Sequence, residues 1–270
     1  MAEDLANFGE RGLVLADQPL ADRAAYALCF NAINFGSGWW PTIRKRPGLS
    51  GSETMMAALE DRFRERGAWE PANLVAIEPA EVAAVLGQDP GHELMAPFAA
   101  ALRELGAQAG SAGGHLELSR ALGDSAGAAV QTLAGWTWFE DRSVHDGETV
   151  PIFKRAQIAV ADLNRAGARS DPDLDRLTLF ADNLIPHVLK LDGVLRFDSE
   201  LDARIEREEL IEHGSPEEVE IRACAVHAVE LLAAAIPSAS AHELDELLWN
   251  RGRDPGYKAR PRHRSRTTAY

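Results

Sequence analysis

Residues Ser215 to Pro237 read SPEEVEIRACAVHAVELLAAAIP, and this stretch is the strongest indication of the fold. Ser215 is a typical N-cap, Pro216 suits the first helical position, and Glu218 can complete a capping box. Apolar residues follow at helical spacing, and Pro237 can end the helix. Because the stretch is apolar on nearly all sides after Ala223, it predicts a buried central helix.

The same start, stop and spacing signals recur along the rest of the chain. They predict further helices over residues 52–66, 78–86, 92–109, 116–122, 124–133, 153–165, 173–181, 184–191, 199–211 and 240–250. Strand signals are weak, apart from a turn-like Asp146-Gly147 that favours a small hairpin over residues 144–152. Loops are short and no linker is visible. We therefore predict an all-α fold: a single compact helical domain over residues 1–270 with a basic C-terminal tail over residues 251–270.

Composition narrows the class of protein. The chain has 270 residues, of which 46% are hydrophobic and 26% charged, as in ordinary globular proteins. No apolar run reaches the roughly 18 residues of a membrane span, and we expect neither membrane association nor a signal peptide. Cys29 and Cys224 lie far apart without metal-binding spacing, so we expect two buried, reduced thiols, a cytoplasmic location, no metal and no cofactor.

The distribution of charge points to a small anionic ligand. A net charge of −14 argues against a duplex nucleic acid partner, which needs a positive face. The tail is different, because seven lysines and arginines between Arg251 and Arg266 stand against one acid, Asp254. Guanidinium groups match phosphate oxygens in geometry. The alternative is a disordered basic tail.

Three other segments carry groups suited to ligand chemistry. Residues 30–41 read FNAINFGSGWWP, where Asn34 offers an amide and Phe35 and Trp39 offer flat rings for a heterocycle. Lys154 near a helix start favours an anion. Asp182 sits among apolar residues just before a helix, where burial would raise its pKa and a cation would lower it. The alternatives are a core aromatic cluster, a solvated lysine and a plain helix cap.

Histidine spacing gives no zinc pattern, and no phosphate-binding glycine motif or nucleophile elbow is present. His227 and Glu230 fall on one face of the helix after Ser215. They are interpreted as a satisfied buried polar pair, with a pocket lining as the alternative.

Taken together and in this order, the segments resemble the queuosine salvage protein family. The resemblance covers about residues 20 to 270 and includes Asn34-Phe35, Lys154-Arg155-Ala156-Gln157 with Asp162, Phe180-Ala181-Asp182 with Pro186, Glu218 to Ala223, Val229-Glu230-Leu231, Asp245, Leu248-Trp249, Pro261, His263, Arg266 and Tyr270. Two departures are the Asn183-Leu184-Ile185-Pro186-His187 run and the added Gly36-Ser37-Gly38.

The resemblance implies a fold akin to helix-hairpin-helix DNA glycosylases and hydrolysis of queuosine 5'-phosphate to queuine and ribose 5-phosphate. It places the acid matching Asp182 beside the base and the reacting sugar carbon, with the lysine matching Lys154 in the same pocket. It also places Asn34 and Phe35 where the family contacts the base. We expect Trp39, Asp162, Asn183 and Glu230 to bind the substrate as well, and Lys258, His263 and Arg266 to hold the 5'-phosphate.

Two other functions are open at the level of sequence. One is a non-catalytic protein that binds a modified nucleobase or nucleotide. The other is a DNA base-excision glycosylase, which would need a basic surface and a glycine-rich hairpin for the DNA backbone. The acidic composition argues against the second.

Overall fold

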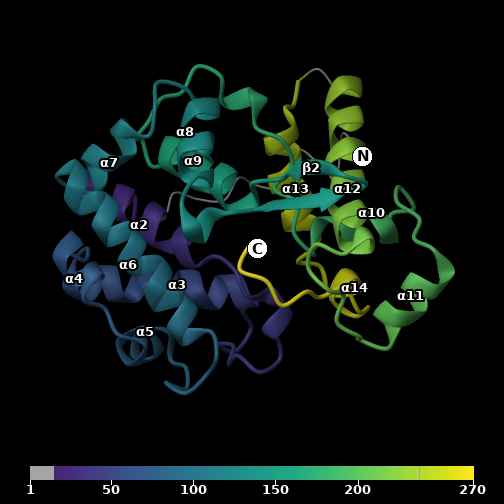
Figure 1. Cartoon of the computed structure of the whole chain (residues 1–270), viewed down its shortest axis with the longest axis horizontal. Helices are drawn as coiled ribbons and strands as arrows, with labels where there is room; N and C mark the ends of the chain where they lie inside the picture. Colours follow the sequence, from purple (N-terminus) through teal and green to yellow (C-terminus); the bar gives the residue numbers. More distant parts are fainter. Residues whose placement is uncertain (1–14, 237) are drawn as a thin grey trace. The chain divides into compact units, whose positions relative to one another are not determined.

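The structure, a computed structural model, describes residues 15–236 and 238–270 and is mostly helical (Figure 1). The prediction of an all-α fold is confirmed, since one two-stranded sheet is the only sheet in the described residues. Among the helices described, none has the length and apolar character to cross a lipid bilayer. The chain forms two compact units: unit 1 contains residues 141–154 and 175–267, and unit 2 contains residues 15–140, 155–174 and 268–270. The single domain and the likeness to DNA glycosylases stay predictions.

Unit 2 is built from helices joined by short turns. Its elements are α2 (Leu20–Ile33), η1 (Ser37–Trp39), α3 (Gly51–Arg66), α4 (Pro71–Val75), α5 (Pro79–Leu86), α6 (Met95–Ala112), α7 (His115–Ala121), α8 (Ala126–Ala134), η2 (Thr137–Phe139) and α9 (Lys154–Arg165), whose first residue belongs to unit 1. Ser50 caps α3 in a full capping box with Glu53, as its sequence signature requires.

The core of unit 2 centres on α6, which packs against α2, α4, α5 and α7. A glycine in the middle of this helix, Gly106, has a packing reason. A Cβ built there would lie 2.6 Å from the Leu74 Cβ and 2.8 Å from the Pro71 carbonyl oxygen of α4. The bare glycine therefore allows the two helices to approach closely, at the usual cost of a glycine in a helix interior.

Unit 1 combines a β-hairpin with helices. Its elements are β1 (Arg142–His145), β2 (Glu148–Pro151), α10 (Ile185–Leu191), α11 (Ser199–Glu206), α12 (Pro216–Ala235), α13 (Ala241–Arg251) and α14 (Pro255–Lys258). The predicted hairpin is confirmed. Its strands are antiparallel, with Arg142 opposite Pro151, and its turn residues Asp146 and Gly147 both have positive φ, as two-residue hairpin turns favour.

The apolar core of unit 1 is formed mainly by α10, α12 and α13. Its buried members are Ile152, Leu179, Ala181, Ile185, Val188, Leu189, Ala225, Val229, Ala241, Leu244 and Leu248. Two of them, Leu179 and Ala181, belong to the segment that leads to Asp182. The predicted functional acid therefore follows a segment that is anchored in the core.

Two predicted helices differ from the structure. The helix over 173–181 is wrong, because only η3 (Leu174–Arg176) forms and residues 177–181 are not helical. There, Asp245 of α13 takes the Phe180 N–H, which a helix would use internally, and Arg222 of α12 binds the Ala181 carbonyl. The helix over 199–211 ends at Glu206, since Leu210 instead pairs with Arg264 in an isolated parallel bridge.

The prediction of a fully buried helix after Ser215 is wrong for one face of α12. Cys224, His227, Glu230 and Leu231 are exposed, and Leu231 is 59% exposed. The expectation of a buried thiol therefore holds for Cys29 and fails for Cys224. The interpretation of His227 and Glu230 as a buried pair fails for the same reason: apolar composition does not show which side of a helix lacks a neighbour.

Candidate active site

Asp182 is half-buried at the end of a segment whose backbone is fixed on both sides. The Phe180 N–H donates to Asp245 Oδ1 of α13 at 2.9 Å, and the Ala181 carbonyl accepts from Arg222 Nε of α12 at 2.9 Å. The Leu184 N–H donates to Asp182 Oδ1 at 2.7 Å, which is the helix-capping role considered from sequence. That bond uses one carboxylate oxygen, and the other makes no hydrogen bond within the described residues.

Arg222 lies at the centre of a buried charged group with Asp141 and Glu218. Its Nη1 and Nη2 atoms are 2.9 and 2.7 Å from the two Asp141 oxygens, and Nη1 is 3.4 Å from Glu218 Oε1. Burial alone would raise the pKa of Glu218. The hydrogen bond from His213 and the charge of Arg222 outweigh burial and lower this pKa to about 2. Glu218 is therefore ionised at neutral pH.

Lys154 belongs to the same arrangement through its backbone. Its N–H donates to Asp141 Oδ2 at 2.9 Å, so one carboxylate binds both Arg222 and the first residue of α9. The Lys154 side chain is 5% exposed. The structure thus rules out the solvated lysine considered from sequence. It connects the two predicted catalytic residues, Lys154 and Asp182, through Asp141, Arg222 and the Ala181 carbonyl.

The tail segment after Pro261 alternates between buried and more exposed residues. His263, Ser265 and Thr267 are buried, whereas Arg264 is half-buried and Arg266 is exposed. The described part of the tail is thus packed rather than loose. Both ring nitrogens of His263 and the Ser265 hydroxyl are buried and have no hydrogen-bond partner among the described residues.

The His263 ring is neutral at pH 7. Burial lowers its pKa to about 4, and the negative charges of Glu218 and Asp182 only partly oppose this effect. A neutral imidazole can donate one hydrogen bond to a phosphate but adds no positive charge. Arg262, which is not among the predicted binding residues, is half-buried, and its pKa is lowered by burial and raised in part by Asp182.

Four predicted binding residues of unit 1 have different surroundings. Asn183 is buried beside Asp182 in the chain. Lys258 in α14 and Arg266 in the tail are exposed, as is Glu230 on α12. The exposure of Lys258 and Arg266 is compatible with contact to a charged phosphate. Their roles, and that of Glu230, stay predictions.

In unit 2 the structure joins Asn34 and Asp162 through Asn31, which is not among the predicted site residues. Asn31 donates to Asp162 Oδ2 at 2.8 Å and accepts from Asn34 at 3.3 Å, while Arg165 donates to Asp162 Oδ1 at 2.9 Å. Asn31 is fully buried in α2. Its position one helical turn before Asn34 is the sequence signal that could have identified it.

The aromatic segment after α2 is mainly part of the core. Phe35 is 5% exposed, and its ring centroid lies 4.8 Å from that of Phe98 and 4.7 Å from the Arg155 guanidinium carbon. Trp39 in η1 is half-buried. The core cluster considered from sequence therefore describes Phe35 well, and the substrate contacts of Asn34, Phe35, Trp39 and Asp162 stay predictions.

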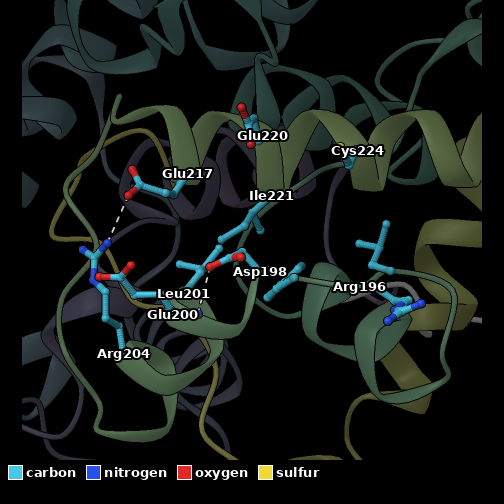
Figure 2. Close-up of a pocket in the computed structure, with 11 residues that line it drawn as sticks. Arg196, Asp198, Glu200, Leu201, Arg204, Glu217, Glu220, Ile221 and Cys224 are labelled. Carbon is cyan, nitrogen blue, oxygen red and sulfur yellow. Dashed lines mark hydrogen bonds and ion pairs between the residues drawn. The ribbon is translucent and has the colours of Figure 1, made fainter.

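A separate pocket of about 450 Å³ lies on unit 1 between the loop before α11, α11 itself and α12 (Figure 2). Figure 2 shows Arg204 and Glu217 paired at one end, and Arg196 and Cys224 on separate segments towards the other end. None of the predicted site residues lines this pocket, so it is distinct from the candidate active site. In the described part of the chain, no three His, Cys, Asp or Glu side chains are grouped so as to hold a metal ion.

Comparison with known proteins gives a consistent result. Residues 15–270 match the model of a family described as queuosine salvage protein. A protein of Sphaerobacter thermophilus named queuosine 5'-phosphate N-glycosylase/hydrolase is 36% identical over 92% of this chain and 81% of its own length. A Dictyostelium discoideum protein of the same name is 34% identical over 57% of this chain and 51% of its own length. A Bos taurus protein of that name is 37% identical over 35% of this chain and 29% of its own length.

Proposed function

Because the chain belongs to the queuosine salvage protein family, we propose that it is an N-glycosidase that hydrolyses queuosine 5'-phosphate to queuine and ribose 5-phosphate. The observation that carries this proposal is the match to the bacterial relative of that name over 92% of the chain. The proposal is supported by a half-buried carboxylate, Asp182, that keeps one oxygen without a hydrogen bond among the described residues.

The chemistry needs a negative oxygen at the sugar. As the bond between the sugar carbon and the base breaks, its electron pair leaves with the base and positive charge develops on the sugar. In the proposed mechanism, the second oxygen of Asp182 stabilises that charge and accepts a proton from the attacking water, whose oxygen forms the new bond to carbon. The leaving base takes up a proton from solvent, and Asp182 then releases its accepted proton to solvent, so one water is consumed overall. Queuine is a 7-deazapurine, so this help cannot come at the ring nitrogen that it lacks.

The other residues of unit 1 have supporting roles in this proposal. The Lys154 ammonium holds the Asp182 carboxylate or binds an oxygen of the ligand. The neutral ring of His263 supplies a hydrogen bond rather than charge. The positive charge for the 5'-phosphate then comes from Arg266 and Lys258, which are exposed. Binding of the phosphate orients the sugar towards Asp182.

The first experiment is incubation of the protein with queuosine 5'-phosphate and detection of queuine by mass spectrometry. Release of queuine supports the proposal, and binding without release indicates the non-catalytic alternative. Asp182→Asn should then lower kcat at least about 100-fold with the fold intact, since Asn can keep the bond from Leu184. Asp198→Asn is the matched control, because Asp198 likewise accepts from the backbone N–H two residues on, at 2.8 Å, and should keep full activity. Full activity in Asp182→Asn would remove this residue from the chemistry.

A further inference from the structure

The buried pair of Arg222 and Asp141 is bonded to the backbone at two points of the candidate site. Arg222 donates its Nε to the carbonyl of Ala181, the residue before Asp182. Asp141 accepts from the N–H of Lys154 while it binds Arg222 through both of its oxygens. The side chains of Arg222 and Asp141 are only 1% and 2% exposed. The pair therefore links the chain at Asp182 to the backbone of Lys154.

We propose that Arg222 and Asp141 are positioning residues, which hold the Asp182 carboxylate and the Lys154 side chain in a fixed geometry for turnover. The proposal rests on the function proposed above. Neither residue is assigned a contact with the substrate. Their effect passes through the 181–182 peptide on one side and the start of α9 on the other.

The energetics of buried ion pairs support a role beyond stability. Removing two charges from water is expensive, and a well-packed apolar pair of similar volume is often as stable or more stable. What apolar side chains cannot supply is a donor for the Ala181 carbonyl and an acceptor for the Lys154 N–H. Loss of the pair would free both backbone groups, and a displacement of about 1 Å in a reacting group can lower a rate about 100-fold.

A second buried pair gives a matched control. The side chains of Arg169 and Asp171 in unit 2 are each 4% exposed, and Arg169 Nη2 lies 2.6 Å from Asp171 Oδ1. Arg169 also donates to backbone carbonyls, including that of Gly123 at 2.9 Å. The chemistry is the same as at Arg222, namely a bidentate carboxylate and a carbonyl bonded to one guanidinium. These contacts do not involve any predicted site residue.

The test compares Asp141→Asn and Arg222→Lys with Asp171→Asn and Arg169→Lys. For each full-length variant, kcat and KM for queuosine 5'-phosphate are measured and normalised to the folded fraction from circular dichroism. Hydrogen–deuterium exchange is followed for the peptide over residues 177–184. Asp141→Asn keeps the size of the side chain, so it carries the test if Arg222→Lys does not fold.

We expect kcat of the first pair of variants to fall about 10- to 100-fold, with KM changed less than about threefold and faster exchange over residues 177–184. We expect the control variants to lose thermal stability while kcat per folded molecule and the exchange of this peptide stay unchanged. If the wild type is active and the Asp141→Asn variant keeps its kcat, this inference is overturned and the proposed function stands. A wild type that releases no queuine overturns the proposed function and this inference with it.

Discussion

His263 offers a direct test of the buried tail, because replacing it should change how stability depends on pH. Its ring is 1% exposed, and burial lowers its pKa from the ordinary 6.5 to about 4. Above pH 6.5 the ring is neutral in both the folded and the unfolded chain, so the pKa shift has no effect on stability. As the pH falls from 6.5 to 4, the unfolded chain binds a proton at this ring and the folded protein does not. Stability must therefore decrease over this range.

The size of the effect follows from the two pKa values. A tenfold difference in proton affinity is worth about 1.4 kcal/mol, so the separation between 6.5 and about 4 corresponds to about 3 kcal/mol. In His263→Gln the titrating group is absent and its side chain remains polar and of similar size. Between pH 7 and pH 4, the free energy of unfolding of the variant should therefore decrease by about 3 kcal/mol less than that of the wild type. This holds whatever the stability of the variant at pH 7.

The assay is urea unfolding followed by circular dichroism at several pH values from about 7 to about 4. His115, whose pKa burial also lowers to about 4, contributes equally to both proteins and cancels in the difference. Ser265→Ala is the control, because it alters the same buried face of the tail without removing a titrating group and should keep the wild-type pH dependence. If His263→Gln also kept that dependence, the ring would not be a neutral buried group in the folded protein.

Two further results are expected. Arg266→Ala should raise KM for queuosine 5'-phosphate about tenfold or more, because the exposed Arg266 is assigned to the phosphate. KM for the unphosphorylated nucleoside should change much less. An equal rise in KM for both substrates would refute that assignment. Glu218→Gln should lower the free energy of unfolding by about 3 kcal/mol at pH 7, because the pKa of Glu218 is lowered to about 2 from 4.5. This stabilisation is complete above pH 4.5 and is lost as the pH falls towards 2, so urea unfolding at pH 3 should show a smaller difference between variant and wild type.

Local sequence signals predicted the fold well wherever local interactions decide the structure. The start at Ser215 and Pro216 gave the beginning of α12, and the helix expected over residues 52–66 begins within one residue of α3. Helix α2 was missed, although it is buried over most of its length, because Pro19 provides no side-chain cap and the apolar residues show no clear periodicity. The error over residues 173–181 has the opposite cause, since long-range bonds from Asp245 and Arg222 override the local preference.

Part of the candidate site could be predicted and part could not. Asp182 stood out because it lay among apolar residues, and Lys154 because a cation near a helix start favours an anion. The structure links the two within one unit. The residues that connect them, Asp141 and Arg222, lie 81 positions apart in sequence and carry no local signal of their pairing. The pKa of His263 was equally out of reach, because burial of a tail residue depends on what packs over it.

The β-hairpin in unit 1 has a practical consequence. Asp141 immediately precedes β1 and Lys154 is the third residue after β2, so both stand at the root of the hairpin. The ladder from Arg142–Pro151 to His145–Glu148, together with the Ile152 N–H bond to the Asp141 carbonyl, fixes the spacing of that root. At the far end, Asp146 and Gly147 are exposed. A dye, an affinity peptide or a natural insertion placed between these two residues would extend into solvent, while the spacing between Asp141 and Lys154 would remain as it is.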